Sequence, residues 1–396
     1  MIMKNRLIIT LLTITMLVVW AAYPDDVSTL RNGGQLAVND LHAKWTAAAP
    51  AERIEMQKTL DRVCAQKDCH ASRLFWFTDL EAAKAEARRV GRPILSLHLL
   101  GKLDEELSCA NSRFFRTLLY SDESISALMR DGFVLHWHSV REVPRVTIEL
   151  GGGRVIRQTI TGNSAHYLLD ANGAPLDVLP GLYSPAAFRD QLERWITLHR
   201  TLTPETLTAY HRDRLIATNA RAVELGIDGR WTVGQQPAWV AQRQAQSKAM
   251  TETRVLRQLK PGERTIARQM EQLAMIGEAG KDAVTFSAST MQLMQSKQAI
   301  TDEVLDNLRR SVAADTAFNE YDLHRRVHEW FVNGEVGDLY SLNERVYDEL
   351  FLTPSSDPWL GLQPDSVFMG IEEQKLRVSP ITIAPASIGS TWVAMQ

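Results

Sequence analysis

The pattern of apolar and polar positions predicts an α/β region that lies between two helical regions. In the first helical region, residues 35–63 read as two short helices that separate at Ala49-Pro50, because proline is favoured in the first turn of a helix. The stretch from Asp25 to Gly34 reads as a loop. We therefore predict a helical N-terminal segment over residues 23–72.

The first half of the α/β region predicts a helix followed by two strands. Residues 80–90 are rich in strong helix formers and begin at a Thr78-Asp79-Leu80-Glu81 capping box. The apolar runs 94–100 and 133–140 are short and lie next to turn residues, which is typical of buried strands. Two helices are predicted between these strands, the first of which begins near Cys109.

The second half of this region predicts two hairpins and a closing helix. Gly151-Gly152-Gly153 separates two alternating runs, and Asn172-Gly173 separates two more, so both glycine-containing stretches read as hairpin turns. A helix begins after Ser184 and runs to about His199. Together these elements predict an α/β unit with a mixed sheet flanked by helices, over residues 73–199.

Residues 200–351 are predicted to form a mainly helical domain. Thr203-Pro204-Glu205 is typical of the start of a helix. The last residues, 352–396, are rich in proline and glycine and have little periodicity, so we predict an irregular C-terminal segment. The helical patterns cover residues 204–225, 236–258, 262–279, 300–313, 318–332 and 341–350.

The first residues, 1–22, form a distinct segment. Lys4 and Arg6 precede an uncharged run from Leu7 to Ala22, which is the arrangement of a secretory signal peptide. The run is shorter than the roughly 20 residues that span a bilayer, although an uncleaved N-terminal anchor is the alternative. Both interpretations place the rest of the chain in the periplasm or outside the cell, with a membrane contact only through an uncleaved N-terminal segment.

Composition and charge exclude several classes of protein. The chain has 396 residues, of which 45% are hydrophobic and 23% are charged, as in ordinary globular proteins. Lys and Arg total 44 against 47 Asp and Glu, so the net charge is -3. Proteins that bind nucleic acid through its phosphates have a basic excess, and we expect no nucleic-acid partner here.

The sequence predicts a disulfide for two of the three cysteines and a free thiol for the third. Cys64 and Cys69 are separated by four residues, and two close cysteines pair in an oxidising compartment, so we predict a disulfide between them. Zinc would need further ligands, and only His70 is adjacent. Cys109 then has no cysteine partner in the chain, and it is either a reactive thiol or a small buried apolar residue.

Two groups of histidines have the spacing of metal ligands, but neither predicts a metal site. His136 and His138 alternate on one predicted strand and His98 lies on another, yet helices are expected to cover that sheet. Glu320, His324 and His328 share a helical face, which reads as a solvated or interhelical polar stripe. Arg325 stands where a zinc-protease helix has its glutamate. We therefore expect no metal and no cofactor.

Residues 73–199 resemble the thioredoxin-like superfamily. Gly91-Arg92-Pro93 followed by the strand Ile94-Leu95-Ser96-Leu97 is similar to the start of exported thioredoxin-like domains, and the hairpin at Asn172-Gly173 followed by a helix is similar to their end. Cys109-Ala110-Asn111-Ser112 stands where the family has Cys-x-x-Cys. The chain departs from the family in having Ser112 at the second cysteine, extra residues at 101–107, and Ser164-Ala165-His166 in place of the cis-proline.

The resemblance implies two alternative functions. In the first, Cys109 carries single-cysteine thiol redox activity of the thiol-disulfide oxidoreductase or peroxidase type, with Ser112 as a hydrogen-bond donor and a thiol reductant as partner. Arg113 would stabilise the thiolate, whereas the carboxylates from Asp104 to Glu106 would oppose it. In the second, the thioredoxin-like unit is a non-catalytic scaffold, and the helical C-terminal domain binds a protein partner.

Overall fold

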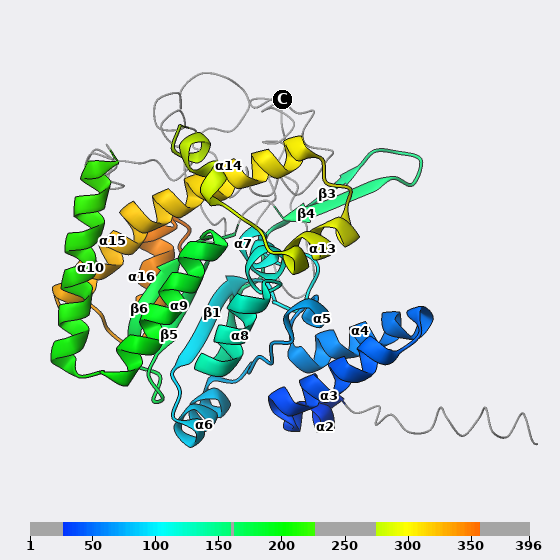
Figure 1. Ribbon diagram of the computed structural model, residues 1–396, viewed down its shortest axis with the longest axis horizontal. Helices are drawn as coiled ribbons and strands as arrows, with labels where there is room; N and C mark the ends of the chain where they lie inside the picture. Colours follow the sequence, from blue (N-terminus) through cyan, green and yellow to red (C-terminus); the bar gives the residue numbers. More distant parts are fainter. Residues whose placement is uncertain (1–26, 160–161, 226–274, 357–396) are drawn as a thin grey trace, which may run out of the picture.

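The structure of the chain is a computed structural model, which describes residues 27–159, 162–225 and 275–356 (Figure 1). The predicted leader, the predicted helix over 236–258 and nearly all of the C-terminal segment lie outside these residues. Among the described helices, none is long and apolar enough to cross a membrane.

A mixed sheet of four strands lies at the centre of the α/β region. Its strands are β1 (Ile94–Leu100), β2 (Val134–Arg141), β5 (Ser164–Leu169) and β6 (Pro175–Pro180), in the order β2-β1-β5-β6. β1 is parallel to β2 and antiparallel to β5, and β6 is antiparallel to β5. Every residue of β1 and β5 is buried, as expected for apolar runs in the middle of a covered sheet. The prediction of a mixed sheet that contains the apolar runs 94–100 and 133–140 is confirmed.

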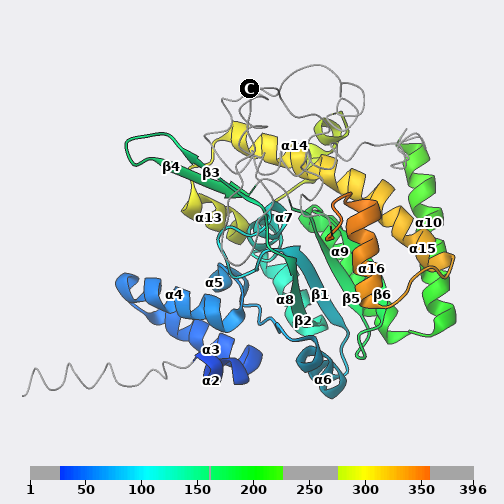
Figure 2. The ribbon, with the colours of Figure 1, turned by 180° about the vertical axis from the view of Figure 1, so that it is seen from behind.

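Helices cover both faces of this sheet. On one face, α8 (Glu123–Gly132) packs against α9 (Pro185–Arg200) (Figure 1). The opposite face carries α16 (Leu339–Arg345), which Figure 2 shows in front of β5 and β6. Helix α6 (Leu80–Val90) begins after Asp79, whose carboxylate accepts a hydrogen bond from the Ala82 amide at 2.7 Å. The predicted capping box is therefore wrong by one residue, since Asp79 rather than Thr78 is the N-cap.

The connection from β1 to β2 contains the helix predicted to begin near Cys109. Helix α7 (Ala110–Phe114) continues directly into the π-helix η2 (Phe115–Leu119), and Cys109 is the N-cap residue of α7. Helix α8 follows, capped by the Asp122 carboxylate. The two predicted helices between the strands are confirmed.

A separate two-stranded hairpin projects from the α/β region. Its strands are β3 (Arg145–Glu149) and β4 (Val155–Thr159), which pair antiparallel (Figure 2). Gly151, Gly152 and Gly153 all have positive φ, a conformation that glycine adopts readily and other residues avoid. The prediction of a turn at the triple glycine is confirmed.

The N-terminal helices have a small apolar core of their own. They are α2 (Val27–Asn32), α3 (Gly34–Ala47), α4 (Pro50–Cys64) and α5 (Cys69–Ser72). The predicted loop over 25–34 is wrong, because α2 occupies most of it. Tertiary contacts favour this helix: the Arg31 guanidinium donates to the carbonyl oxygens of Val63 at 2.7 Å and Trp76 at 2.8 Å. The core of this unit comprises Val38, Leu41, Leu60, Val63, Cys64, Cys69 and Phe75.

The helices after residue 200 share one hydrophobic core with the sheet. Buried residues such as Val312, Val327 and Tyr347 belong to the same continuous cluster as Leu97 and Leu168. The sequence did not predict α13, whose apolar residues lack a clear helical period. Besides α16, these elements are α10 (Pro204–Glu224), α13 (Ala288–Lys297), α14 (Asp302–Phe318), η7 (Asn319–His324), α15 (Arg325–Val332) and η8 (Val346–Leu350). The described residues thus form an α/β unit followed by a mainly helical region packed onto it.

Candidate functional site

Cys109 is completely buried at the start of α7. Its Sγ lies 2.9 Å from the Oγ of Ser164, the first residue of β5. Gly162 covers it closely, because a methyl group placed on Gly162 would lie only 2.3 Å from the Cys109 Cβ. Gly162 and the hydroxyl of Ser164 therefore both lie against the Cys109 side chain.

Ser112 is also completely buried, and its hydroxyl bonds to the protein rather than to the sulfur. Its Oγ lies 2.7 Å from the Ser108 Oγ and 2.8 Å from the Cys109 carbonyl oxygen. The role predicted for Ser112, a hydrogen bond to the Cys109 thiolate, is taken by Ser164 in the structure. The sequence did not indicate Ser164 as this partner, since it is 55 residues away from Cys109.

The tyrosines near Cys109 are neutral. Burial raises the pKa of Tyr120 and of Tyr347 well above the usual value, and the proximity of Cys109 adds to the shift. The Tyr120 hydroxyl lies 2.6 Å from the Nε2 of His166, and burial lowers the pKa of His166 to about 3. His166 is therefore uncharged at neutral pH and already hydrogen-bonded.

Arg113 carries the positive charge that the sequence places near the sulfur. Its guanidinium donates to the Ser108 carbonyl oxygen at 2.8 Å and to the Thr159 Oγ1 at 2.9 Å. Among the acids expected to oppose it, Glu105 pairs with Arg145 at 2.7 Å. The bond to Thr159 joins α7 to strand β4, and the bond to Ser108 is local to the start of α7.

Cys64 and Cys69 form a disulfide in the core of the N-terminal helices, as the sequence predicts, with their Cα atoms 6.2 Å apart. Both are completely buried. Because each is bonded to the other, neither is a free thiol that could resolve a mixed disulfide on Cys109. The neighbouring His70 packs against Trp45, with ring centroids 5.2 Å apart.

The sequence did not indicate the second buried polar site, which surrounds Asp177 on β6. The Asp177 carboxylate is completely buried and accepts hydrogen bonds from three helices. The Trp195 indole of α9 donates at 2.7 Å and the Tyr210 hydroxyl of α10 at 2.8 Å. The Nε2 of His324, at the end of η7, lies 3.0 Å from the same carboxylate.

Asp177 and His324 form a buried ion pair. Burial alone would lower the pKa of His324, but the carboxylates of Asp177 and Glu320 outweigh it and raise that pKa to about 9. Burial likewise opposes ionisation of Asp177, but the positive His324 holds the pKa of Asp177 well below its usual range. Glu320 in turn pairs with Arg214 of α10 at 2.8 Å. The two cations and two carboxylates therefore balance in charge, and we call these four residues the Asp177 network.

One group of described residues has a spacing that suits a metal ion. Its ligand atoms lie within 4.8 Å of one another, and its members are Asp177, His324 and His328. However, His324 is protonated at neutral pH, so a metal would have to displace its proton. The Asp177 carboxylate already accepts hydrogen bonds from several donors. His328 is neutral, because burial lowers its pKa well below the usual value, and its Nδ1 lies 2.8 Å from the Nδ1 of His211. The geometry thus supports an ion-pair network between β6 and the helices.

Of the two alternatives predicted for the polar face of Glu320, His324 and His328, the structure shows the interhelical one. The face is interhelical, as one of the two alternatives proposed, but it is not solvated, because His324 and His328 are completely buried. The sequence showed the helical face but not what it would contact. Asp177 lies 147 positions earlier in the chain than His324.

The three sheet histidines share one face but bond to separate partners. His98 and His138 are opposite each other on β1 and β2, with ring centroids 5.3 Å apart. The His136 Nδ1 lies 2.8 Å from the Ser96 Oγ, and the His98 Nδ1 lies 2.9 Å from the Asn343 Oδ1 of α16. Within the described residues, these histidines do not form a group with metal-ligand spacing.

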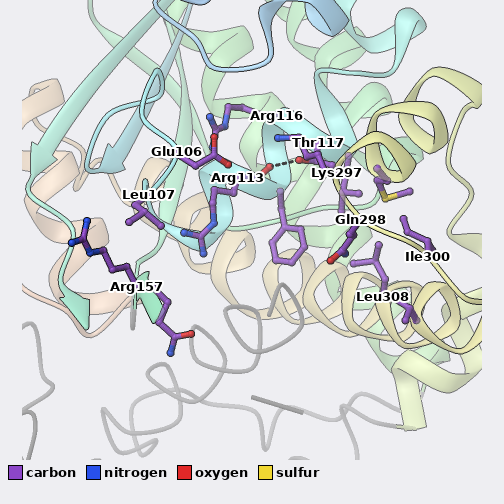
Figure 3. Close-up of a pocket in the computed structure, with 15 residues that line it drawn as sticks. Glu106, Leu107, Arg113, Arg116, Thr117, Arg157, Lys297, Gln298, Ile300 and Leu308 are labelled. Carbon is purple, nitrogen blue, oxygen red and sulfur yellow. Dashed lines mark hydrogen bonds between the residues drawn. The ribbon is translucent and has the colours of Figure 1, made fainter. Parts of the chain in front are cut away.

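An open cavity lies beside α7, where the hairpin strand β4 meets helices α13 and α14 (Figure 3). Its volume is about 310 Å³, and its walls combine apolar and cationic side chains. Arg113 and Phe114 of α7 face it together with Arg157 and Gln158 of β4. The cavity therefore lies between the α/β unit and the helical region.

No protein-family model, no curated protein and no solved structure matches this chain. The described residues establish a mixed four-stranded sheet with helices, a disulfide in the N-terminal helices, and a buried single thiol at the start of α7.

Proposed function

We propose that the chain is an exported protein in which a thioredoxin-like unit acts as a non-catalytic scaffold, with the helical region and α7 together forming a site for a protein partner. The observation that carries this proposal is the burial of Cys109. The sulfur is completely buried, lies against Gly162 and bonds to Ser164, and residue 112 is a serine. A thiol that exchanges disulfides has to contact its substrate in line, which this arrangement prevents.

The sheet supports the thioredoxin-like fold. The order β2-β1-β5-β6, with one parallel pair followed by an antiparallel hairpin, agrees with the resemblance in the sequence. Cys109 begins the helix that follows β1, and Ser164 opposes it from the start of β5. That place corresponds to the loop in which the family has its cis-proline.

Three features argue against thiol catalysis. First, the sulfur is not exposed. Second, Ser112 replaces the resolving thiol, and Cys64 and Cys69 are bonded to each other. Third, His166 has its pKa lowered to about 3 by burial, so at neutral pH it supplies no positive charge to stabilise a thiolate. A single exchange step by Cys109 would end in a mixed disulfide that nothing in the described residues resolves.

The helical region supports a binding role because it is fixed to the sheet. The Asp177 network connects β6 to α10 and η7, and α13 and α14 form one wall of the cavity beside α7. Pre-organised walls reduce the entropy lost on binding. The disulfide in the N-terminal helices is consistent with an oxidising compartment, as the leader predicts.

A disulfide-reduction assay tests the proposal. The full mature chain is incubated with insulin and excess dithiothreitol, and insulin reduction is followed by turbidity. We expect the wild type and Cys109→Ala to give the same rate as dithiothreitol alone. A rate above this background that Cys109→Ala abolishes would contradict the scaffold proposal.

Single-cysteine redox activity is the second candidate, because Cys109 lies at a helix start, where amide groups favour a thiolate. The Ser112→Cys variant separates the candidates. If the site is catalytically competent apart from its missing thiol, this variant should gain insulin reductase activity. We expect no gain, because Ser112 is as buried as Cys109.

A further inference from the structure

The hairpin of β3 and β4 has strand edges on which, among the described residues, no other strand pairs. The two strands form a sheet by themselves, and Figures 1 and 2 both show the hairpin projecting from the α/β region. A two-stranded sheet is marginally stable alone in water, and an uncovered edge is a template for a further strand. The hairpin is therefore suited to strand addition.

Of the two strands, β3 has the more open edge. Exposed and half-buried residues alternate over the whole length of β3, whereas β4 ends in the buried Gln158 and Thr159. Thr159 also accepts a hydrogen bond from Arg113 of α7, so the base of β4 lies against the body of the protein. A further strand therefore has more room along β3 than along β4.

The register of the hairpin shows which backbone groups of β3 point outward. The Leu150 N–H donates to the Arg154 carbonyl oxygen at 2.9 Å, and bonded pairs alternate along an antiparallel ladder, so the even-numbered residues of β3 bond to β4. The backbone N–H and C=O groups of Arg145, Thr147 and Glu149 consequently point away from β4. These outward groups make no hydrogen bond within the described part of the chain.

The sequence of β3 is complementary to itself in the antiparallel direction. The strand reads Arg145-Val146-Thr147-Ile148-Glu149. Two copies that pair about Thr147 have an arginine opposite a glutamate at both ends, and a valine opposite an isoleucine on each side of the centre. Opposite charges and β-branched side chains are favourable cross-strand pairs. This register also uses the outward backbone groups, since Thr147 is one of the three residues that present them.

The charges at the ends of β3 are free to pair in this way. Glu149 makes no ion pair with any described residue. Arg145 pairs with Glu105 at 2.7 Å, but both side chains are exposed, and such a pair contributes little to stability. A guanidinium has five N–H donors, so Arg145 can bind a second carboxylate as well as that of Glu105.

We propose that β3 is a dimerisation strand whose partner is a second copy of this chain. The two β3 strands pair antiparallel about a two-fold axis at Thr147 and join the two hairpins into one four-stranded sheet. The half-buried Val146 and Ile148 of both copies then lie on one face of that sheet. The paired segment is short, so the dimer is reversible rather than obligate. This inference goes beyond the proposed function, since it concerns how copies of the chain assemble.

Sedimentation equilibrium of the full mature chain tests the dimer. Between about 1 and 300 µM, we expect the mean mass to rise from that of a monomer toward that of a dimer. Arg145→Glu puts two carboxylates opposite each other at both ends of the paired strands and should weaken dimerisation at least about tenfold. Arg145→Glu combined with Glu149→Arg restores opposite charges and should dimerise as the wild type does.

Two comparisons exclude other causes of the charge effect. Arg154→Glu reverses a charge in the exposed turn of the same hairpin, outside β3, and should leave dimerisation unchanged. The double variant restores the pairing between the two copies but not the ion pair with Glu105. Recovery of the dimer in the double variant therefore assigns the effect to the interface.

A cysteine cross-link tests the register. Thr147→Cys puts two thiols opposite each other at the two-fold axis, where the Cα atoms of a bonded pair are about 5.5 Å apart, within reach of a disulfide. Arg157→Cys is the matched control, because Arg157 lies opposite Thr147 in the hairpin, on the strand away from the second copy. On oxidation, we expect Thr147→Cys to form a covalent dimer and Arg157→Cys to remain monomeric.

Three results would overturn the proposal. The first is a wild-type chain that stays monomeric at about 300 µM. The second is a dimer that Arg145→Glu does not weaken, or that the added Glu149→Arg does not restore. The third is cross-linking of Thr147→Cys that is no faster than that of Arg157→Cys.

Discussion

Cys109 and Asp177 are both completely buried beside the same sheet, yet their surroundings differ in charge. The tyrosines and histidine near the sulfur are neutral, and its hydrogen-bond partner is a hydroxyl. The Asp177 carboxylate is ionised and is matched by the positive His324. A buried thiol is stable as a small apolar group, whereas a buried carboxylate is stable only with donors and a countercharge.

This difference assigns different roles to the two sites. The surroundings of Cys109 bury its thiol within the core. The Asp177 network spans the contact between the sheet and the helices after residue 200, so its loss should affect stability more than any change at the cysteine.

Removing the charge of Asp177 should have the largest effect. Asp177→Asn leaves the positive His324 with Glu320 as its remaining carboxylate, and breaking a buried pair in this way costs about 3–5 kcal/mol. The free energy of unfolding from urea titration measures the loss. Asp190→Asn on the exposed side of α9 is the control, with an expected change below about 0.5 kcal/mol. A loss below about 1 kcal/mol for Asp177→Asn would contradict the network.

The stability of the chain should fall at alkaline pH because of His324. Its folded pKa of about 9 exceeds the usual value of 6.5, so its contribution is complete below pH about 6.5 and is lost as the pH rises through about 9. The shift corresponds to about 3 kcal/mol. The titratable groups around this ring are Asp177, Glu320, His211 and His328, and Arg214 pairs with Glu320.

Urea titrations between pH about 6.5 and 9.5 measure this loss, and His324→Gln provides the comparison. The variant lacks the titrating group, so its stability should depend less on pH over the same range. If the free energy of unfolding changed with pH equally in the wild type and the variant, His324 would not be the group that causes the alkaline loss of stability.

Gly162→Ala should have a smaller effect at the cysteine. The new methyl group would overlap Cys109, and φ at this position is +145°, so we expect a loss of about 2 kcal/mol. Gly152→Ala is the matched control: φ is +59° there, but nothing lies within 4 Å of the new group, so about 1 kcal/mol is expected. Thermal unfolding of the two variants gives the difference. Equal losses would mean that Gly162 does not pack on the sulfur.

The sequence predicted most of the local elements of the α/β unit because their signals are local. The apolar run at 94–100, the Asn172-Gly173 turn and the cap at Ser184 each specify structure within a few residues. Helix α2 was not predicted, because it depends on Arg31 bonding to carbonyl groups far along the chain.

The candidate sites were less predictable because their contacts are long-range. The sequence indicated Cys109 at a helix start, but its burial depends on Gly162 and Ser164, which follow two further strands of a hairpin. It indicated the face of His324 and His328 but not the partner Asp177, which reads as an ordinary residue of a short strand. No local pattern reports which side chains meet across a sheet edge.

The alkylation rate of Cys109 tests the central claim most directly. The mature chain is incubated with iodoacetamide at several pH values, native and in denaturant, and the labelled fraction is measured by intact mass and peptide mapping. We predict that the native thiol reacts at least about a hundredfold more slowly than the unfolded one, because the sulfur is buried. Native alkylation as fast as in denaturant, with an inflection below pH about 7, would contradict the scaffold and identify Cys109 as a working thiol.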